Sequence, residues 1–158
     1  MNHKAITPVA QNEWAQLLRS NDLRAITQRV RLLDFHHHHP HSDAENIFVG
    51  LRPNLTTLSL QAVHVIVQDL SKKGLIRRTS LPDANSARYE TRIADNHHHI
   101  QCVQCGHIED VDCVIGAAPC LDPSHTHGMR IIEANIVFRG ICRTCDSSNP
   151  DEGKTHDV

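Results

Sequence analysis

The organisation of this chain is decided by the stretch His97-His98-His99-Ile100-Gln101-Cys102-Val103-Gln104-Cys105-Gly106. Three imidazoles lead directly into a Cys-x-x-Cys turn, so metal-binding side chains occur at two different spacings. A β-strand points successive side chains to opposite faces, which predicts that His97 and His99 share one face and His98 lies on the other. The tight turn brings two thiolates to one ion. We therefore expect two metal sites here, one structural and rich in sulfur, the other a sensor site of nitrogen and oxygen ligands.

A second Cys-x-x-Cys pair follows the last apolar stretch of the chain. Four thiolates complete the tetrahedral coordination of zinc and leave no open position, so such a site is structural. An iron–sulfur cluster or a dithiol switch is the alternative, although clusters more often carry further cysteines at other spacings. A small second domain with few aromatic residues needs such a clamp. The predicted ligands of the structural zinc are Cys102, Cys105, Cys142 and Cys145.

Length and composition point to a cytoplasmic metal-binding protein. The 158 residues suffice for one ordinary domain or two small ones. There is no run of 18 apolar residues and no apolar signal-peptide core at the start, so no membrane segment is expected. In the reducing cytoplasm, six cysteines and fourteen histidines predict metal ligands or redox thiols before disulfides. His3 and His156 are expected to be ordinary exposed histidines.

Charge divides the chain. Residues 1–89 hold eleven Lys and Arg against seven Asp and Glu, a net +4, whereas residues 90–158 hold five against eleven, a net −6. The basic half suits nucleic acid and the acidic half suits a cation such as a metal ion.

The first half predicts an α-helical domain that ends in a β-hairpin. Amphipathic helices are expected over 13–19, 28–37, 43–51 and 60–73, and strands over 75–79 and 87–93 around a turn at 82–86. The expected N-caps are Thr27, Ser42 of a capping box and Ser59, with Gly74 after the last helix. This order is typical of a winged helix-turn-helix DNA-binding domain.

DNA contacts are expected from the polar side of the 60–73 helix and from the basic residues after it. The alternative is a plain surface helix, which the basic cluster and the caps disfavour. The candidates are Ser59, Gln61, His64, Gln68, Lys72, Lys73, Arg77 and Arg78.

The second half predicts a small α/β domain over 91–146, after a DNA-binding domain over 1–90 and before a disordered tail over 147–158. Strands are expected over 98–102, 106–111 and 130–138, and no helix can be assigned between 113 and 128. Cys113 and Cys120 are either a redox pair or small core residues. His125 and His127 are more simply explained as loop residues than as an accessory metal site.

The sensor site needs ligands from separated segments. Imidazole with carboxylate suits iron(II), manganese or zinc. A ligand contributed by the first domain would let metal occupancy set the arrangement of the two domains, as a switch requires. The candidates are Glu90, His97, His99 and Asp110, with one further ligand from His36–His41.

These motifs resemble the ferric uptake regulator (Fur) family of bacterial metal-dependent repressors, over roughly residues 12 to 145. The finer resemblance is to the actinobacterial FurA group, which is similar to the peroxide-sensing PerR branch and typically controls a catalase-peroxidase gene. The matching motifs are His39-Pro40-x-x-Asp43, the Ser59–Gly74 helix, Ala87-Arg-Tyr-Glu90, Asp95-Asn-His-His-His99-x-x-Cys102-x-x-Cys105-Gly106, Asp110-Val-Asp-Cys113, Ala118-Pro-Cys120-Leu and Cys142-x-x-Cys145.

The resemblance implies an α+β chain, with an N-terminal winged helix-turn-helix domain and a zinc-containing α/β dimerisation domain. It implies a regulatory iron(II) or manganese(II), for which zinc can substitute in vitro, and oxidation of His39 or His97 by peroxide. Arg24 lies where the family uses a basic residue near the minor groove. The implied regulatory ligands are His39, Glu90, His97, His99 and Asp110.

One departure concerns the DNA-reading helix, which has Ala62-Val63-His64-Val65 where the family usually has Thr-Val-Tyr-Arg.

Taken together, the motifs and the resemblance predict a homodimeric repressor that binds palindromic operator DNA and is not an enzyme. The alternatives are a repressor that senses only iron or zinc sufficiency, and a zinc-ribbon metalloenzyme. The metalloenzyme is disfavoured because no further catalytic motif accompanies the histidines.

Overall fold

The structure is a computed structural model that describes residues 11–82, 84–93, 97–114, 123–131 and 134–146. The chain divides into two compact units, residues 1–94 and 95–158. Helices occupy the first unit and a sheet the second, which confirms the predicted α+β class. The predicted tail over 147–158 lies outside the described residues.

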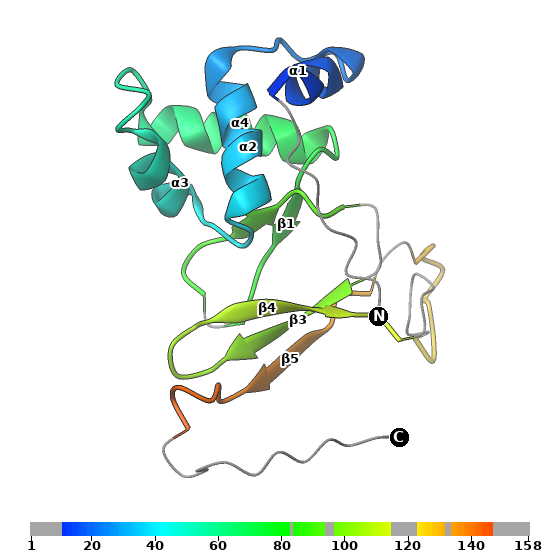
Figure 1. Ribbon diagram of the computed structural model, residues 1–158. Helices are drawn as coiled ribbons and strands as arrows, with labels where there is room; N and C mark the ends of the chain where they lie inside the picture. Colours follow the sequence, from blue (N-terminus) through cyan, green and yellow to red (C-terminus); the bar gives the residue numbers. More distant parts are fainter. Residues whose placement is uncertain (1–10, 83, 94–96, 115–122, 132–133, 147–158) are drawn as a thin grey trace. The chain divides into compact units, whose positions relative to one another are not determined.

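The described residues of the first unit form four helices followed by a two-stranded antiparallel hairpin, in the predicted order. Figure 1 shows α4 running across behind α2, with β1 and β2 beyond the end of α2. The hairpin pairs Arg77 with Glu90 and Thr79 with Arg88, and its strands are shorter than the sequence predicts. The elements are α1 (Gln11–Ser20), α2 (Thr27–His38), α3 (Ala44–Leu51), α4 (Leu60–Lys72), β1 (Arg77–Thr79) and β2 (Arg88–Glu90).

The core of this unit is aliphatic and lies between the helices. Fully buried leucine, isoleucine and valine side chains from all four helices meet there, at about 1.5–3 kcal/mol of hydrophobic stabilisation for each large side chain. They include Leu18, Leu32, Leu33, Ile47, Val63, Val67 and Leu70. In α4 the buried positions recur with the helical period, so its opposite side is left exposed.

The ends of α4 are as predicted. The Ser59 side chain accepts a hydrogen bond of 3.1 Å from the backbone N–H of Ala62. Gly74 has a φ of +67°, a left-handed conformation that glycine adopts without the Cβ penalty. Helix α2 differs, because Thr27 is its first helical residue and Ile26 occupies the N-cap without a side-chain bond.

The N-cap of α3 is Asp43 and not the predicted Ser42. Asp43 accepts a 2.8 Å hydrogen bond from the backbone N–H of Asn46. Ser42 instead donates its hydroxyl to the carbonyl of His39. The backbone carbonyl of Ser42 accepts a hydrogen bond from the backbone N–H of Tyr89. A bridge to the hairpin therefore takes Ser42 out of the capping role and fixes the segment between α2 and α3 beside β2.

The second unit is built on a three-stranded sheet with the order β4-β3-β5. Its strands are β3 (His97–Cys102), β4 (Ile108–Asp112) and β5 (Val137–Gly140). Strand β3 is central, antiparallel to β4 and parallel to β5. The strand predicted over 130–138 begins only at Val137. Because β4 and β5 flank β3 on opposite sides and β5 is parallel to β3, the chain must cross from one edge of the sheet to the other before β5 begins. Figure 1 shows the three strands side by side.

Candidate metal centres and nucleic-acid interface

Four thiols meet at one end of the sheet and form what we call the thiol cluster, Cys102, Cys105, Cys142 and Cys145. Tight turns shape both halves. The backbone N–H of Gly106, whose φ is +74°, donates to the carbonyl of Cys102, and that of Cys145 donates to the carbonyl of Cys142. The parallel pairing of β3 with β5 places Cys102 opposite Gly140 and thereby brings the second turn beside the first.

The spacing of the thiol cluster matches a tetrahedral zinc site. Its four sulfur atoms lie within 4.8 Å of one another, and those of Cys105 and Cys142 are 3.7 Å apart. A zinc–sulfur bond of about 2.3 Å places tetrahedral ligands about 3.8 Å apart. Backbone N–H groups of Cys105 and Cys142 lower the pKa of Cys102 to about 6, which favours a thiolate there. Hydrogen bonding to Cys142 and Cys105 raises the pKa of Cys145 to about 12, because these contacts stabilise its protonated thiol.

A second group, the imidazole cluster, consists of His97, His99 and Asp110. His99 and Asp110 are register partners across β3 and β4, and His97 lies two residues along the same face. The Nε2 atoms of His97 and His99 lie 3.9 and 3.8 Å from Oδ1 of Asp110. Two ligands at about 2.1 Å from one cation are about 3 to 4 Å apart, so the spacing suits a shared ion better than a direct hydrogen bond.

His98 lies on the opposite face, as the alternation predicts. Its ring packs edge-on against Phe138, with 6.3 Å between ring centroids. The expectation that His98 is not a primary ligand beside His97 and His99 agrees with this contact.

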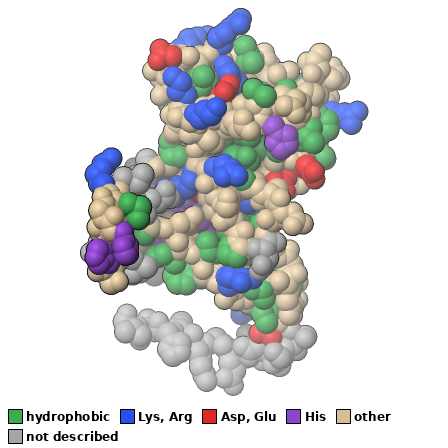
Figure 2. All heavy atoms as spheres, turned by 180° about the vertical axis from the view of Figure 1, so that it is seen from behind, with side chains coloured by type: hydrophobic (Ala, Val, Ile, Leu, Met, Phe, Trp, Pro, Cys, Tyr) green, Lys and Arg blue, Asp and Glu red, His purple; other side chains and the backbone are tan. Residues whose placement is uncertain are grey.

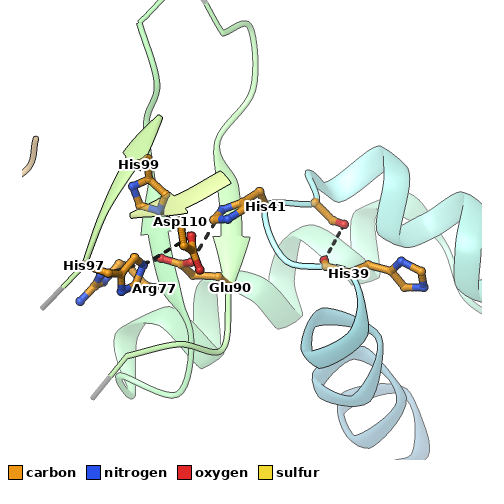
Figure 3. A network of polar contacts seen from close by, with 8 residues as sticks. His39, His41, Arg77, Glu90, His97, His99 and Asp110 are labelled. Carbon is orange, nitrogen blue, oxygen red and sulfur yellow. Dashed lines mark hydrogen bonds and ion pairs between the residues drawn. The ribbon is translucent and has the colours of Figure 1, made fainter. Parts of the chain in front are cut away.

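In the first unit, the residue that faces Glu90 is His41. Nδ1 of His41 lies 3.7 Å from Oε2 of Glu90, whose side chain is 1% exposed. Arg77 approaches the other carboxylate oxygen at 3.9 Å. His41 has a φ of +60°, a left-handed conformation that is uncommon for residues other than glycine. Figure 3 shows His41 and Arg77 directed at Glu90.

The prediction of His39 as the ligand beside Glu90 is not supported by the structure. The ring of His39 is exposed and packs on Phe35, with 4.6 Å between centroids, and Figure 3 shows it turned away from Glu90. The physical reason is the bridge between Ser42 and Tyr89, which brings the residue before Ser42, His41, next to β2. In the sequence, His41 differs from the other histidines of the predicted range His36–His41 in directly preceding Ser42.

His36 is buried among the helices rather than directed to a metal. It is 0% exposed, neither ring nitrogen has a hydrogen-bond partner within the described part of the chain, and its ring lies 6.1 Å from that of Tyr89. Burial lowers the pKa of His36 from 6.5 to about 4, and the charge of Glu90 partly opposes this shift.

The neutral state of His36 predicts acid sensitivity of the first unit. Above pH 6.5 the ring is neutral in both folded and unfolded chains. As the pH falls from 6.5 to 4 only the unfolded chain takes up this proton, so the free energy of unfolding should drop by about 3 kcal/mol in that window. Urea unfolding followed by fluorescence of Trp14, the single tryptophan, measures it.

His36→Leu should lose that part of the pH dependence and retain full stability at pH 7, because an unbonded buried imidazole contributes little there. His38→Leu, at an exposed position, is the control. Equal pH slopes for the wild type and His36→Leu would contradict the assignment.

The candidate DNA-reading surface is the exposed side of α4. Gln61, His64 and Gln68 are exposed there as predicted, and Ser59 is exposed at the N-cap with its oxygen engaged by Ala62. Lys72 and Lys73 are exposed at the far end, where Lys73 lies 3.8 Å from Asp22.

Two basic candidates differ in their placement. Arg24 is exposed before α2, whereas Arg77 points at Glu90 and does not suit a DNA contact. Its neighbour Arg78 is exposed on β1. Figure 2 shows Lys and Arg spread over the face in view, with Asp and Glu between them, so that face holds no single basic patch.

The remaining cysteines and histidines do not form a third site among the described residues. Cys113 follows β4 and is partly exposed, and Cys120 lies outside the described residues. The rings of His125 and His127 stack at 4.4 Å with a 25° interplanar angle, and Nδ1 of His125 accepts the backbone N–H of His127. Nearly parallel rings do not converge on one ion, which favours the loop explanation.

A helical unit that ends in a hairpin, followed by a sheet with a thiol cluster and an imidazole cluster, defines a metal-responsive DNA-binding regulator. The chain belongs to the ferric uptake regulator family, whose family model matches residues 20–139. Proteins of this family are transcriptional regulators and not enzymes, and they bind operator DNA as dimers. None of the described helices is long and apolar enough to cross a membrane.

Relatives and solved structures agree with this assignment. The chain is 42% identical to the transcriptional regulator FurA of Mycobacterium tuberculosis over 144 residues, which cover 91% of this chain and 96% of the relative. It is 41% identical to ferric uptake regulation protein 2 of Mycolicibacterium fortuitum, covering 84% and 92%. The Fur structure of Helicobacter pylori shares the fold, with a TM-score of 0.67 at 20% identity over 90% of this chain and 98% of that one.

Proposed function

We propose that this chain is a cytoplasmic, iron-responsive repressor that binds palindromic operator DNA as a dimer and releases it when peroxide oxidises the regulatory site. The observation that carries the proposal is the imidazole cluster, in which two buried histidines face one carboxylate at 3.8 and 3.9 Å. Imidazole and carboxylate donors suit iron(II) or manganese(II), whereas the thiol cluster suits zinc. A structural ion and a regulatory ion can therefore be held apart by ligand chemistry.

The regulatory ligands are proposed to be His41, Glu90, His97, His99 and Asp110. His41 takes the place expected for His39, since it is the histidine beside Glu90. If both units supply ligands, the ion would bind more tightly to the conformation that brings those ligands together than to one that separates them. This difference in binding free energy is what would let the metal control DNA affinity. Arg77 places a positive charge beside the Glu90 carboxylate. A bound metal ion would balance the same negative charge in its place.

Metal-dependent DNA binding is the direct test. Protein that retains its zinc should bind a duplex selected from a random 30-bp pool when manganese(II) is added, and chelation of that manganese should lower the affinity at least 100-fold. Mobility shift at fixed salt measures the effect, because non-specific binding changes steeply with salt. Equal retardation with and without manganese would contradict the proposed function.

Peroxide sensing is tested by mass spectrometry of the iron(II)-loaded protein. We expect brief peroxide treatment to add one oxygen atom to His41 or His97, replacing a ring C–H with C–OH while peroxide is reduced to water. The manganese-loaded protein, treated identically, is the control and should remain unmodified. DNA release with unmodified histidines and oxidised cysteines would contradict this route.

Iron sufficiency without peroxide sensing is the second candidate function. It is favoured by the 41% identity to a protein named for ferric uptake regulation. In that case manganese- and iron-loaded proteins should both keep their DNA after peroxide treatment, which separates the two functions.

A further inference from the structure

The exposed side of α4 carries a narrow set of side chains that the structural core does not use. We call Gln61, His64, Val65 and Gln68 the α4 stripe. At about 100° per residue these positions fall within about 100° of the helix circumference. All four are exposed, and the Val65 side chain, at 48% exposed, offers methyl groups to a partner on this side of the helix.

The charges of α4 restrict what the stripe can read. The structure describes this helix in full, and it has no Lys or Arg before Lys72, its last residue. Its acidic residue, Asp69, is held by Arg29 at 2.7 Å and faces α2. A helix that reads guanine usually does so with a bidentate Arg or Lys, and the first three turns of α4 offer none.

The glutamine and valine side chains of the stripe suit A·T pairs. The side-chain amide of glutamine can pair both N6 and N7 of adenine in the major groove, and a valine methyl group can pack on the C5-methyl of thymine. Gln61 and Gln68 are seven residues apart, about 10 Å along the helix, which corresponds to about three base-pair steps. Val65 lies between them on the same side.

We propose that α4 selects A·T pairs through Gln61 and Gln68, each on the edge of an adenine, with Val65 on the methyl group of a thymine between them. This inference rests on the proposed function, because it requires α4 to enter the major groove. It assigns sequence specificity to uncharged side chains and leaves the basic residues to phosphate contacts, which position a protein without reading sequence.

Base analogues test each contact separately. A half-site is first selected from the random 30-bp pool with the manganese-loaded protein. Replacing a contacted adenine with 7-deazaadenine, which lacks N7, should weaken wild-type binding about 10-fold or more, and this loss should disappear in Gln61→Ala or Gln68→Ala. Deoxyuridine in place of the contacted thymine should weaken binding a few-fold in the wild type and not in Val65→Ala.

Gln16→Ala, an exposed glutamine on α1, is the matched control and should keep every analogue effect. Circular dichroism establishes that the α4 variants are folded. A selected half-site whose analogue losses are the same in the wild type and in all three stripe variants overturns the inference while the proposed function stands. Failure to select any duplex with manganese instead overturns the proposed function itself.

Discussion

Cys102→Ser is expected to eject zinc and to unfold the second unit, with the first unit still folded. Cys102 is the buried member of the thiol cluster and ends the central strand β3. A structural zinc ion contributes about 10 to 16 kcal/mol in small zinc domains, which is comparable with the whole free energy of unfolding of a domain, about 5 to 15 kcal/mol. The described part of this unit has only a three-stranded sheet to replace that contribution.

The outcome is measured separately in each unit. Metal analysis should find zinc in the wild type and none in Cys102→Ser, and amide hydrogen exchange in β3 and β4 should become fast. Fluorescence of Trp14 should report an unchanged first unit, where this residue packs in the core. Cys113→Ser is the control, because Cys113 lies outside the thiol cluster. A zinc-free Cys102→Ser protein with slow exchange in β3 would show that zinc is not structural.

Glu90→Gln and His97→Ala are each expected to abolish binding of the regulatory ion and with it metal-dependent DNA affinity, by at least about 100-fold. Loss of a residue that only orients a ligand already costs about 10- to 100-fold in metal affinity, so loss of a ligand should cost more. Glu90→Gln keeps the shape of a side chain that is 1% exposed, which limits the damage to packing. Titration with manganese followed by mobility shift measures both quantities.

The pair of variants also tests whether one ion is shared. If it is, either substitution alone removes one manganese per chain, and the double variant is no worse than the single ones. His107→Ala is the control, since His107 is an exposed histidine paired with Glu109 at 2.8 Å. Two weak, independent ions, each lost in only one of the variants, would contradict a shared site.

Much of the site could be predicted because its ligands follow local rules. The Cys-x-x-Cys turns and the alternation that sets His97 and His99 apart from His98 depend on residues a few positions apart. The same holds for the ends of α4 at Ser59 and Gly74. Strand and helix periodicity and helix capping involve residues only a few positions apart, so they can be predicted from the amino-acid sequence.

The residues around Glu90 are where local rules are insufficient. The motifs leave the ligand open within His36–His41, the resemblance implies His39, and the basic cluster predicts a DNA contact for Arg77. The neighbours of Glu90 instead depend on pairing between segments far apart in the sequence. The bridge from Ser42 to Tyr89 sets which histidine lies beside Glu90, and the register of β1 with β2 sets Arg77 opposite it.

Local sequence was enough to predict the α+β class, the four cysteines of the thiol cluster and the shared face of His97 and His99, because each depends on spacing within one element or turn. Long-range packing was needed to show that His41 approaches Glu90, and that His36 is buried with no hydrogen-bond partner among the residues described. Five of the six residues 36–41 are histidines, and their side chains are chemically identical. What distinguishes them is the left-handed turn at His41 and the packing of α2, which direct one imidazole to a carboxylate and another into the core.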